Sequence, residues 1–179
     1  MAVVHTVVAT DKQALENIDH WVEEGVFEPR AVTFDEQNAL VRVPFEQEDA
    51  ASGLPPDAPD YDPDDGPYED LGLPAPLLIS ATKSVAEYKV PVFRCQLEIA
   101  AVERAKISGR SLDHRRTLGH IEYEDKRRAV VVSVIGPVTI QAAVARLHVS
   151  LQVTDEIVGY YRRRYYRWGA ATISPLLPP

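Results

Sequence analysis

The sequence predicts an α+β fold dominated by antiparallel strands, about eight in number, arranged as a curved sheet, a sandwich or a small barrel. Three observations support this class. Residues 91–107 alternate between apolar and polar side chains, valine-rich runs recur between turn residues, and amphipathic helical patterns occur near both chain ends. The chain has 179 residues, 45% of them hydrophobic, which fits a single domain over residues 1–179 that folds without a metal or disulfide.

A strand and the first helix are expected at the N-terminus. Residues 2–9 are rich in valine, which favours a strand. Thr10 is the expected N-cap, Gln13 completes a capping box, and the helix is expected over about residues 11–24, before Gly25. The apolar stripe of this helix consists of Leu15, Ile18, Trp21 and Val22.

Strands are expected through the middle of the chain. One hairpin joins residues 31–34 to residues 39–45, and another joins residues 118–123 to residues 129–135, each across a short polar turn. Between them, residues 91–107 form the clearest alternating segment. Its apolar face carries Phe93, Cys95, Leu97 and Ile99, and its polar face carries Arg94, Gln96 and Glu98.

The last part of the chain fits two periods. Residues 138–153 match both a strand and a helix, and their Val and Thr content favours strands. Thr154 is followed by two acidic residues, which predicts the start of a C-terminal helix that ends at Gly169. The apolar face of that helix is expected to carry Ile157, Tyr161, Tyr165 and Trp168.

Residues 46–76 differ in composition from the rest of the chain. They include ten acidic side chains, seven of the 14 prolines, and no Lys, Arg or His. The net charge of -8 is concentrated there, because the remaining residues include 17 acidic and 19 basic side chains. Proline and mutually repelling carboxylates keep a chain extended, so we expect a mobile loop inserted between two parts of one sheet.

This acidic loop is the first candidate binding site, because carboxylates interleaved with tyrosines suit a partner that has a basic surface. The residues assigned to this role are Asp57, Asp60, Tyr61, Asp62, Asp64, Asp65, Tyr68, Glu69 and Asp70. The alternate aspartates are spaced like those of a calcium loop, but Asp65 stands at the required glycine position and Leu71 at that of the bidentate glutamate. We therefore expect no metal.

The second candidate is a cluster of arginines and aromatic residues in the predicted C-terminal helix. Phosphate contact and base stacking use these side chains, which makes a nucleic-acid site an alternative. Its residues are Arg162, Arg163, Arg164 and Arg167. The plainer interpretation is that the aromatic residues pack in the core while the arginines form a solvated rim.

A third alternative is a cofactor-independent enzyme of unknown class. Its pocket is expected to use His120, Glu122 or His148, and at least two of them must come within hydrogen-bonding distance. The sequence contains no nucleophile elbow and no glycine-rich phosphate loop. Cys95, the single cysteine, lies on the apolar face of a predicted strand, so we expect an inert core residue.

The sequence as a whole favours a non-enzymatic protein-interaction domain, either an immunity- or antitoxin-like binder or an accessory subunit. The motivation is a β-rich domain that combines a concentrated acidic loop with an Arg/Tyr cluster and lacks a catalytic motif. We expect a protein partner, no cofactor and no membrane association. The N-terminus does not resemble a signal peptide, which predicts a cytoplasmic location.

Overall fold

The computed structural model describes residues 1–47, 72–74, 76–109, 114–166 and 171–175, with side chains described as far as residue 164. The chain divides into two compact units. Unit 1 comprises Met1–Ala2, Glu48–Phe93 and Asp155–Pro179, and unit 2 comprises Val3–Gln47 and Arg94–Thr154. Two strands, β6 (Val85–Ile99) and β11 (Val149–Tyr166), belong partly to each unit.

Antiparallel strands dominate both units, as predicted. The described residues form twelve strands and one α-helix, so the expected number of about eight strands and the second helix are wrong. Apart from its parts of β6 and β11, unit 2 contains β1 (Val3–Ala9), α1 (Lys12–Val22), β2 (Val26–Phe27), the 3-10 turn η1 (Pro29–Ala31), β3 (Thr33–Asp35), β4 (Leu40–Gln47), β7 (Val102–Gly109), β8 (Arg116–Glu124), β9 (Ala129–Val134) and β10 (Val138–Val144).

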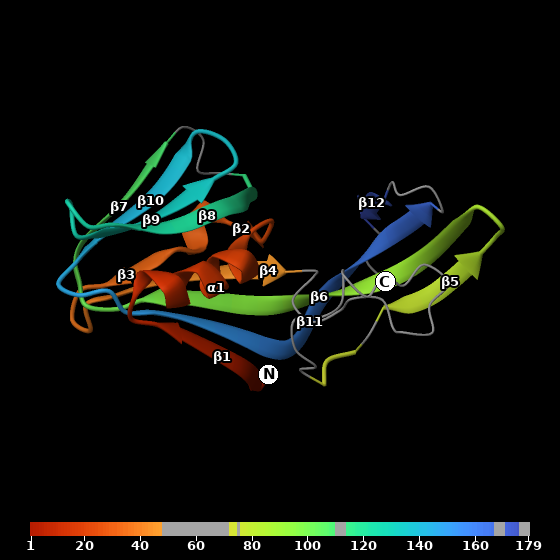
Figure 1. Ribbon diagram of the computed structural model, residues 1–179, viewed down its shortest axis with the longest axis horizontal. Helices are drawn as coiled ribbons and strands as arrows, with labels where there is room; N and C mark the ends of the chain where they lie inside the picture. Colours follow the sequence, from red (N-terminus) through yellow and green to blue (C-terminus); the bar gives the residue numbers. More distant parts are fainter. Residues whose placement is uncertain (48–71, 75, 110–113, 167–170, 176–179) are drawn as a thin grey trace. The chain divides into compact units, whose positions relative to one another are not determined.

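The sheet of unit 2 curls around α1. Its strands follow the order β1-β11-β6-β4-β2-β8-β9-β10-β7, and β3 pairs with β4. The helix contacts both β1 and β8, which have four strands between them in this order, so the sheet must bend to bring both strands to α1 (Figure 1). The described strands begin at β1 and end at β7 without closing into a barrel.

The helix begins one residue later than the sequence predicted. Asp11, rather than Thr10, is the N-cap, and its carboxylate accepts a hydrogen bond from the Ala14 amide at 2.8 Å. The buried residues of α1 are Leu15, Ile18 and Val22, which confirms most of the predicted apolar stripe, whereas Trp21 is half-buried. No described helix is long and apolar enough to span a membrane.

The core of unit 2 is formed by alternate side chains of its strands. In β4, in β10 and in the part of β6 that belongs to unit 2, buried residues alternate with half-buried or exposed ones, which confirms the alternation predicted around Cys95. Both predicted hairpins are present, as β3–β4 and β8–β9. The expected continuous strand over 91–107 is wrong, because the chain turns at Ala101, whose φ is 56°, and β7 follows.

Unit 1 contains four antiparallel strands in the order β5-β6-β11-β12. They are β5 (Leu77–Ala81), the first part of β6, the second part of β11, and β12 (Ala171–Pro175). Figure 1 shows β5 beside β6 and β12 beside β11.

The predicted C-terminal helix is wrong, because residues 154–166 continue β11. This stretch is rich in β-branched and aromatic residues, which favour strands over helices. Pairing with β6 and with β12 supplies backbone hydrogen bonds on both sides of the strand. This stabilisation exceeds the local preference for a helix start that the acidic residues indicated. The strands predicted within 138–153 are confirmed as β10 and the start of β11.

The predicted acidic loop begins two residues too early, because Glu46 and Gln47 belong to β4 and Glu46 pairs with Val26. Residues 48–71 and 75 lie outside the described residues.

Candidate interaction surface

The strand β5 lies at one edge of unit 1. It pairs with β6 through Leu77–Lys89, Leu78–Tyr88 and Ala81–Ala86, with a register shift at Ile79. Among the described strands it pairs with no other, so one side of its backbone faces away from the sheet. The turn into β6 is fixed by Thr82, whose amide donates to the Val85 carbonyl at 2.8 Å and whose hydroxyl accepts from the Val85 amide at 3.1 Å.

All five residues of β5 are exposed, although three of them are large and apolar. The exposed fractions are 65% for Leu77, 50% for Leu78 and 47% for Ile79. A single exposed leucine is ordinary in a folded protein, but three consecutive apolar residues on an edge strand form a surface that can accept another strand.

A charged network lies on the neighbouring strands. Glu87 on β6 faces two arginines of β11 and keeps only 13% of its side chain exposed. Arg164 Nε donates to Glu87 Oε2 at 3.0 Å. Arg162 Nε lies 2.7 Å from Glu87 Oε1. The two groups form an ion pair, but the N–H bond is not aligned for a hydrogen bond. Arg162 and Arg164 are two residues apart on a strand, which explains why one carboxylate reaches both.

Lys89 extends the same face of β6. Its Nζ lies 3.9 Å from the ring centroid of Tyr160, a cation–π contact with β11. The charged face of unit 1 is therefore organised by contacts between β6 and β11.

The predicted binding residues fall into two groups. Asp57, Asp60, Tyr61, Asp62, Asp64, Asp65, Tyr68, Glu69 and Asp70 lie outside the described residues, as does Arg167. The other three arginines, Arg162, Arg163 and Arg164, occupy β11 and not a helix. The structure brings Arg162 and Arg164 together around Glu87, a residue that the sequence analysis did not single out.

The residues of the predicted enzyme pocket are not joined by any described hydrogen bond. His120 and Glu122 are exposed on β8, and His148 precedes β11. His120 Nδ1 instead lies 3.3 Å from Asp19 Oδ2 on α1, and Asp19 Oδ1 accepts from the Ile121 amide at 2.7 Å. Asp19 was missed because its only signal is a position beside the apolar stripe of α1. The described residues contain no cluster of three potential metal ligands.

The sulfur of Cys95 is buried, as predicted. Burial raises the pKa of this thiol to about 12, because the core cannot solvate a thiolate. A thiol with this pKa is protonated at neutral pH, so Cys95 is unsuited to act as a nucleophile.

The chain was compared with protein-family models, with curated proteins and with solved structures, and none of them matches it.

Proposed function

We propose that this protein is a non-enzymatic protein-interaction domain whose partner adds a strand to the free side of β5. The observation that carries the proposal is the exposed run Leu77, Leu78 and Ile79 on a strand paired on one side only among the described strands. In strand addition, main-chain hydrogen bonds supply affinity and alternate side chains supply specificity. The exposed apolar side chains of β5 suit this mode of binding.

Charge defines the chemistry of the partner. The acidic residues between Asp57 and Asp70 precede Leu77 by 7 to 20 residues in the chain, and no basic residue lies among them. A partner that combines an apolar strand with basic flanking residues matches both features. Attraction between opposite charges raises the association rate and weakens as salt is added. An immunity- or antitoxin-like binder and an accessory subunit are the two kinds of protein that this proposal includes.

The test is affinity purification of the tagged full chain from its native cells, with and without nuclease, followed by mass spectrometry. A double variant, Leu77→Lys with Ile79→Lys, places two charges on the edge of β5, which opposes both strand addition and a basic partner. The matched control is Val8→Lys, because Val8 is also an exposed apolar residue on a strand, in unit 2.

The proposal requires a stoichiometric partner that survives nuclease treatment, is retained by the control and is lost with the double variant. Size-exclusion chromatography of the purified protein identifies the case in which the partner is a second copy of this chain. Recovery of a partner that nuclease removes supports instead the nucleic-acid alternative through Arg162, Arg163, Arg164 and Arg167. A partner retained equally by the wild type and the double variant contradicts binding at β5.

A further inference from the structure

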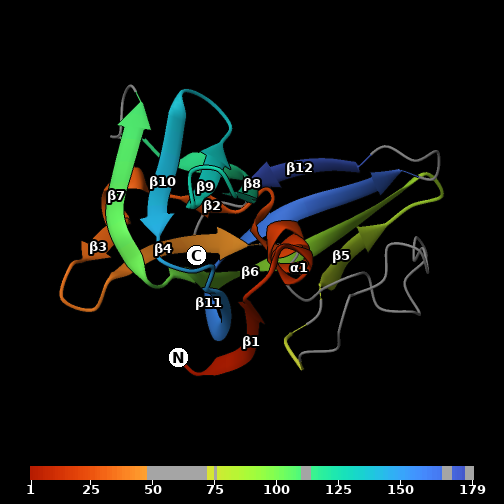
Figure 2. The same ribbon diagram turned by 60° about the vertical axis from the view of Figure 1, so that its left-hand side comes forward.

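A hollow of about 530 Å³ lies on unit 2, over the strands β7, β10 and β9. Figure 2 shows β7 and β10 side by side, and β9 pairs with the other side of β10. Three basic residues line the hollow, Arg104 and Lys106 from β7 and Arg127 from the turn before β9. Among the described residues, no carboxylate lines it. Its volume lies within the range of roughly 300–1,000 Å³ that is typical of sites for small ligands.

Strand register explains why the surface is hollow here. Arg104 pairs with Ala143 of β10, and Ala143 pairs with Ala129 of β9. Paired residues of antiparallel strands point to the same face, so two small alanines lie between the arginine and the turn that carries Arg127. In the next row Lys106 pairs with Gln141, which also lines the hollow. The alanines leave the space, and the longer side chains border it.

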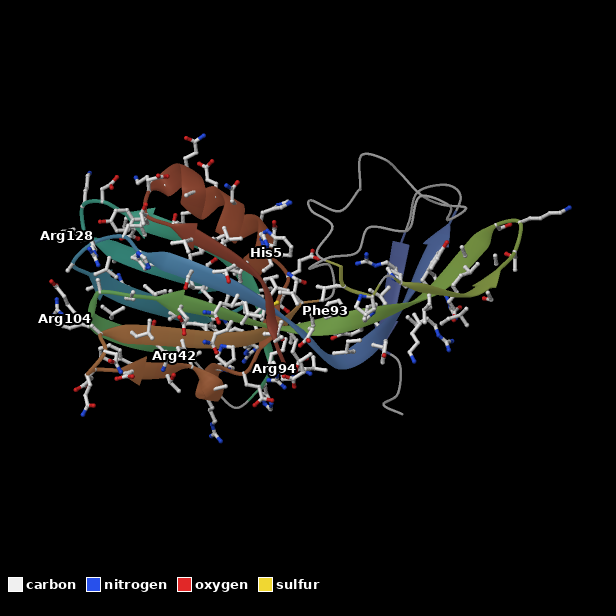
Figure 3. The ribbon with its side chains drawn as sticks, turned by 90° about the horizontal axis from the view of Figure 1, so that it is seen from below. His5, Arg42, Phe93, Arg94, Arg104 and Arg128 are labelled. Atoms are coloured by element: carbon white, nitrogen blue, oxygen red, sulfur yellow. The ribbon has the colours of Figure 1, made fainter. Side chains whose placement is uncertain are left out.

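The distances suit convergence on one ligand. Two strand spacings separate β7 from β9, or about 10 Å. The long side chains of Arg104 and Lys106 on one border and of Arg127 on the other can each extend over a large part of that distance. They can therefore contact one ligand between them. In Figure 3 Arg104 lies at the surface of unit 2, toward the end at which Arg128 also lies.

The charges of Arg104 and Lys106 are not neutralised by any described residue, since neither takes part in a described ion pair or side-chain hydrogen bond. Two other cations of unit 2 are used structurally: Arg42 pairs with Glu98 at 3.0 Å, and Arg128 donates to the Ala145 carbonyl. Arg127 pairs with Glu124 at 3.2 Å, in an exposed contact that costs little to rearrange.

A second hollow in unit 2, of about 270 Å³, supplies a contrast. Two glutamates and two arginines line it, and one pair, Arg115 and Glu46, forms an ion pair. Its charges are balanced within the protein. The larger hollow has an excess of positive charge and small residues on its floor.

We propose that the larger hollow binds a small organic molecule that carries a phosphate group. Phosphate oxygens accept hydrogen bonds from a guanidinium fork and from an ammonium group, which Arg104, Arg127 and Lys106 supply. The Gln141 amide can bond to a polar group of the remaining molecule, which rests over Ala129 and Ala143. This site belongs to unit 2 and does not depend on the partner proposed for β5.

The test is isothermal titration calorimetry, in which the full chain is titrated with inorganic pyrophosphate and separately with ADP, at low and at moderate salt. Arg104→Glu and Lys106→Glu are each expected to weaken binding by at least about tenfold, since a hydrogen bond to a charged group is lost and a repulsive charge is gained. Charge reversal is chosen over alanine because charged residues on an edge strand such as β7 oppose aggregation, and glutamate keeps the strand charged. Lys83→Glu, an exposed lysine between β5 and β6, is the matched control.

Saturable binding that weakens with salt, is lost in both β7 variants and is unchanged in Lys83→Glu supports the site. Circular dichroism and thermal unfolding of each variant establish that the fold is retained. Absence of saturable binding of both probes at low salt overturns the proposal. So does binding that Lys83→Glu weakens as much as Arg104→Glu. Binding of a single-stranded oligonucleotide, lost in the same variants while both probes fail to bind, overturns it in favour of nucleic acid.

Discussion

The side-chain amide of Gln47 donates a hydrogen bond to the main-chain carbonyl of Trp21, at 2.9 Å. The same Nε2 lies 2.9 Å from the carbonyl oxygen of Glu23. The last carbonyls of a helix lack partners within the helix, so a side chain of β4 here caps the end of α1. Gln47 is only 4% exposed, which makes this contact part of the packing between helix and sheet.

Replacing Gln47 with alanine is therefore expected to lower the free energy of unfolding by about 1–3 kcal/mol, because the carbonyls of Trp21 and Glu23 lose a donor that is itself buried. Urea titration followed by circular dichroism measures the change. Gln13→Ala, an exposed substitution on the same helix, is the control and should change stability by less than about 0.5 kcal/mol. Equal effects of the two substitutions would contradict the capping role.

A second prediction concerns the irregular pairing of β8 with β9, where the register shifts between Leu118 and Ile121. Ser133 Oγ accepts from the His120 amide at 2.8 Å and donates to the His120 carbonyl at 3.1 Å. A Cβ added at Gly119 lies 2.9 Å from the same Oγ. Gly119→Ala and Ser133→Ala should each destabilise the fold by about 1–2 kcal/mol, the first by crowding and the second by leaving polar groups without a partner.

The double variant of Gly119 and Ser133 should cost less than the sum of the single variants, because removal of the hydroxyl also removes the atom that the new methyl group meets. A double-mutant cycle in urea measures the coupling, which we expect to exceed about 0.5 kcal/mol. Additive effects would show that crowding at Gly119 does not act through Ser133.

The strands that the sequence predicted correctly are those in which burial repeats with a period of two. In β6 the run from Cys95 to Ile99 has one buried and one polar face, so the pattern itself specifies the strand. The turn after it had no such signal. Ala100 and Ala101 are not typical turn residues, and only the positive φ of Ala101 marks the reversal.

The error over the C-terminal segment has a geometric origin. Ile157, Tyr161 and Tyr165 are each four residues apart, a spacing that fits one face of a helix and also alternate positions of a strand. Pairing with β6 and β12 decides between them, and the sequence of one segment does not contain this information.

The hollow over β7, β10 and β9 was equally inaccessible to sequence analysis. Arg104, Ala129 and Gln141 come from three different strands, and only the register places them together. A one-residue slip of β7 would turn Arg104 and Lys106 to the opposite face.

A third prediction tests the charged network of unit 1. Glu87→Gln keeps the size of the side chain but removes the anion that Arg162 and Arg164 share, leaving two neighbouring guanidinium groups. Both arginines are partly exposed, so solvent screens much of the repulsion and we expect a loss of about 1 kcal/mol. Hydrogen exchange of the β11 amides measures the local change. Glu122→Gln, at an exposed site on β8, should leave the exchange of β11 unchanged, and equal effects would contradict the role of Glu87.

The last prediction concerns the pH dependence of stability that Cys95 imposes. Its thiol has a pKa of about 12 in the folded chain, against an ordinary value of 9.0, because burial disfavours the thiolate. The folded state therefore keeps a proton that the unfolded state loses between these values. The contribution of Cys95 is fully present below pH 9 and decreases as the pH rises toward 12.

In that range the free energy of unfolding should fall by about 1.4 kcal/mol per pH unit more steeply in the wild type than in Cys95→Ala. Urea titrations of both proteins from pH 8.5 to pH 10.5, roughly the accessible part of the range, measure the difference in slope, which removes the contribution of lysines and tyrosines common to both.

A thiol reagent supplies an independent check, because the chain contains one cysteine. The folded protein should react slowly at about pH 8 and the urea-unfolded chain rapidly. Parallel stability curves, or rapid reaction in the folded state, would show that the sulfur is accessible to solvent.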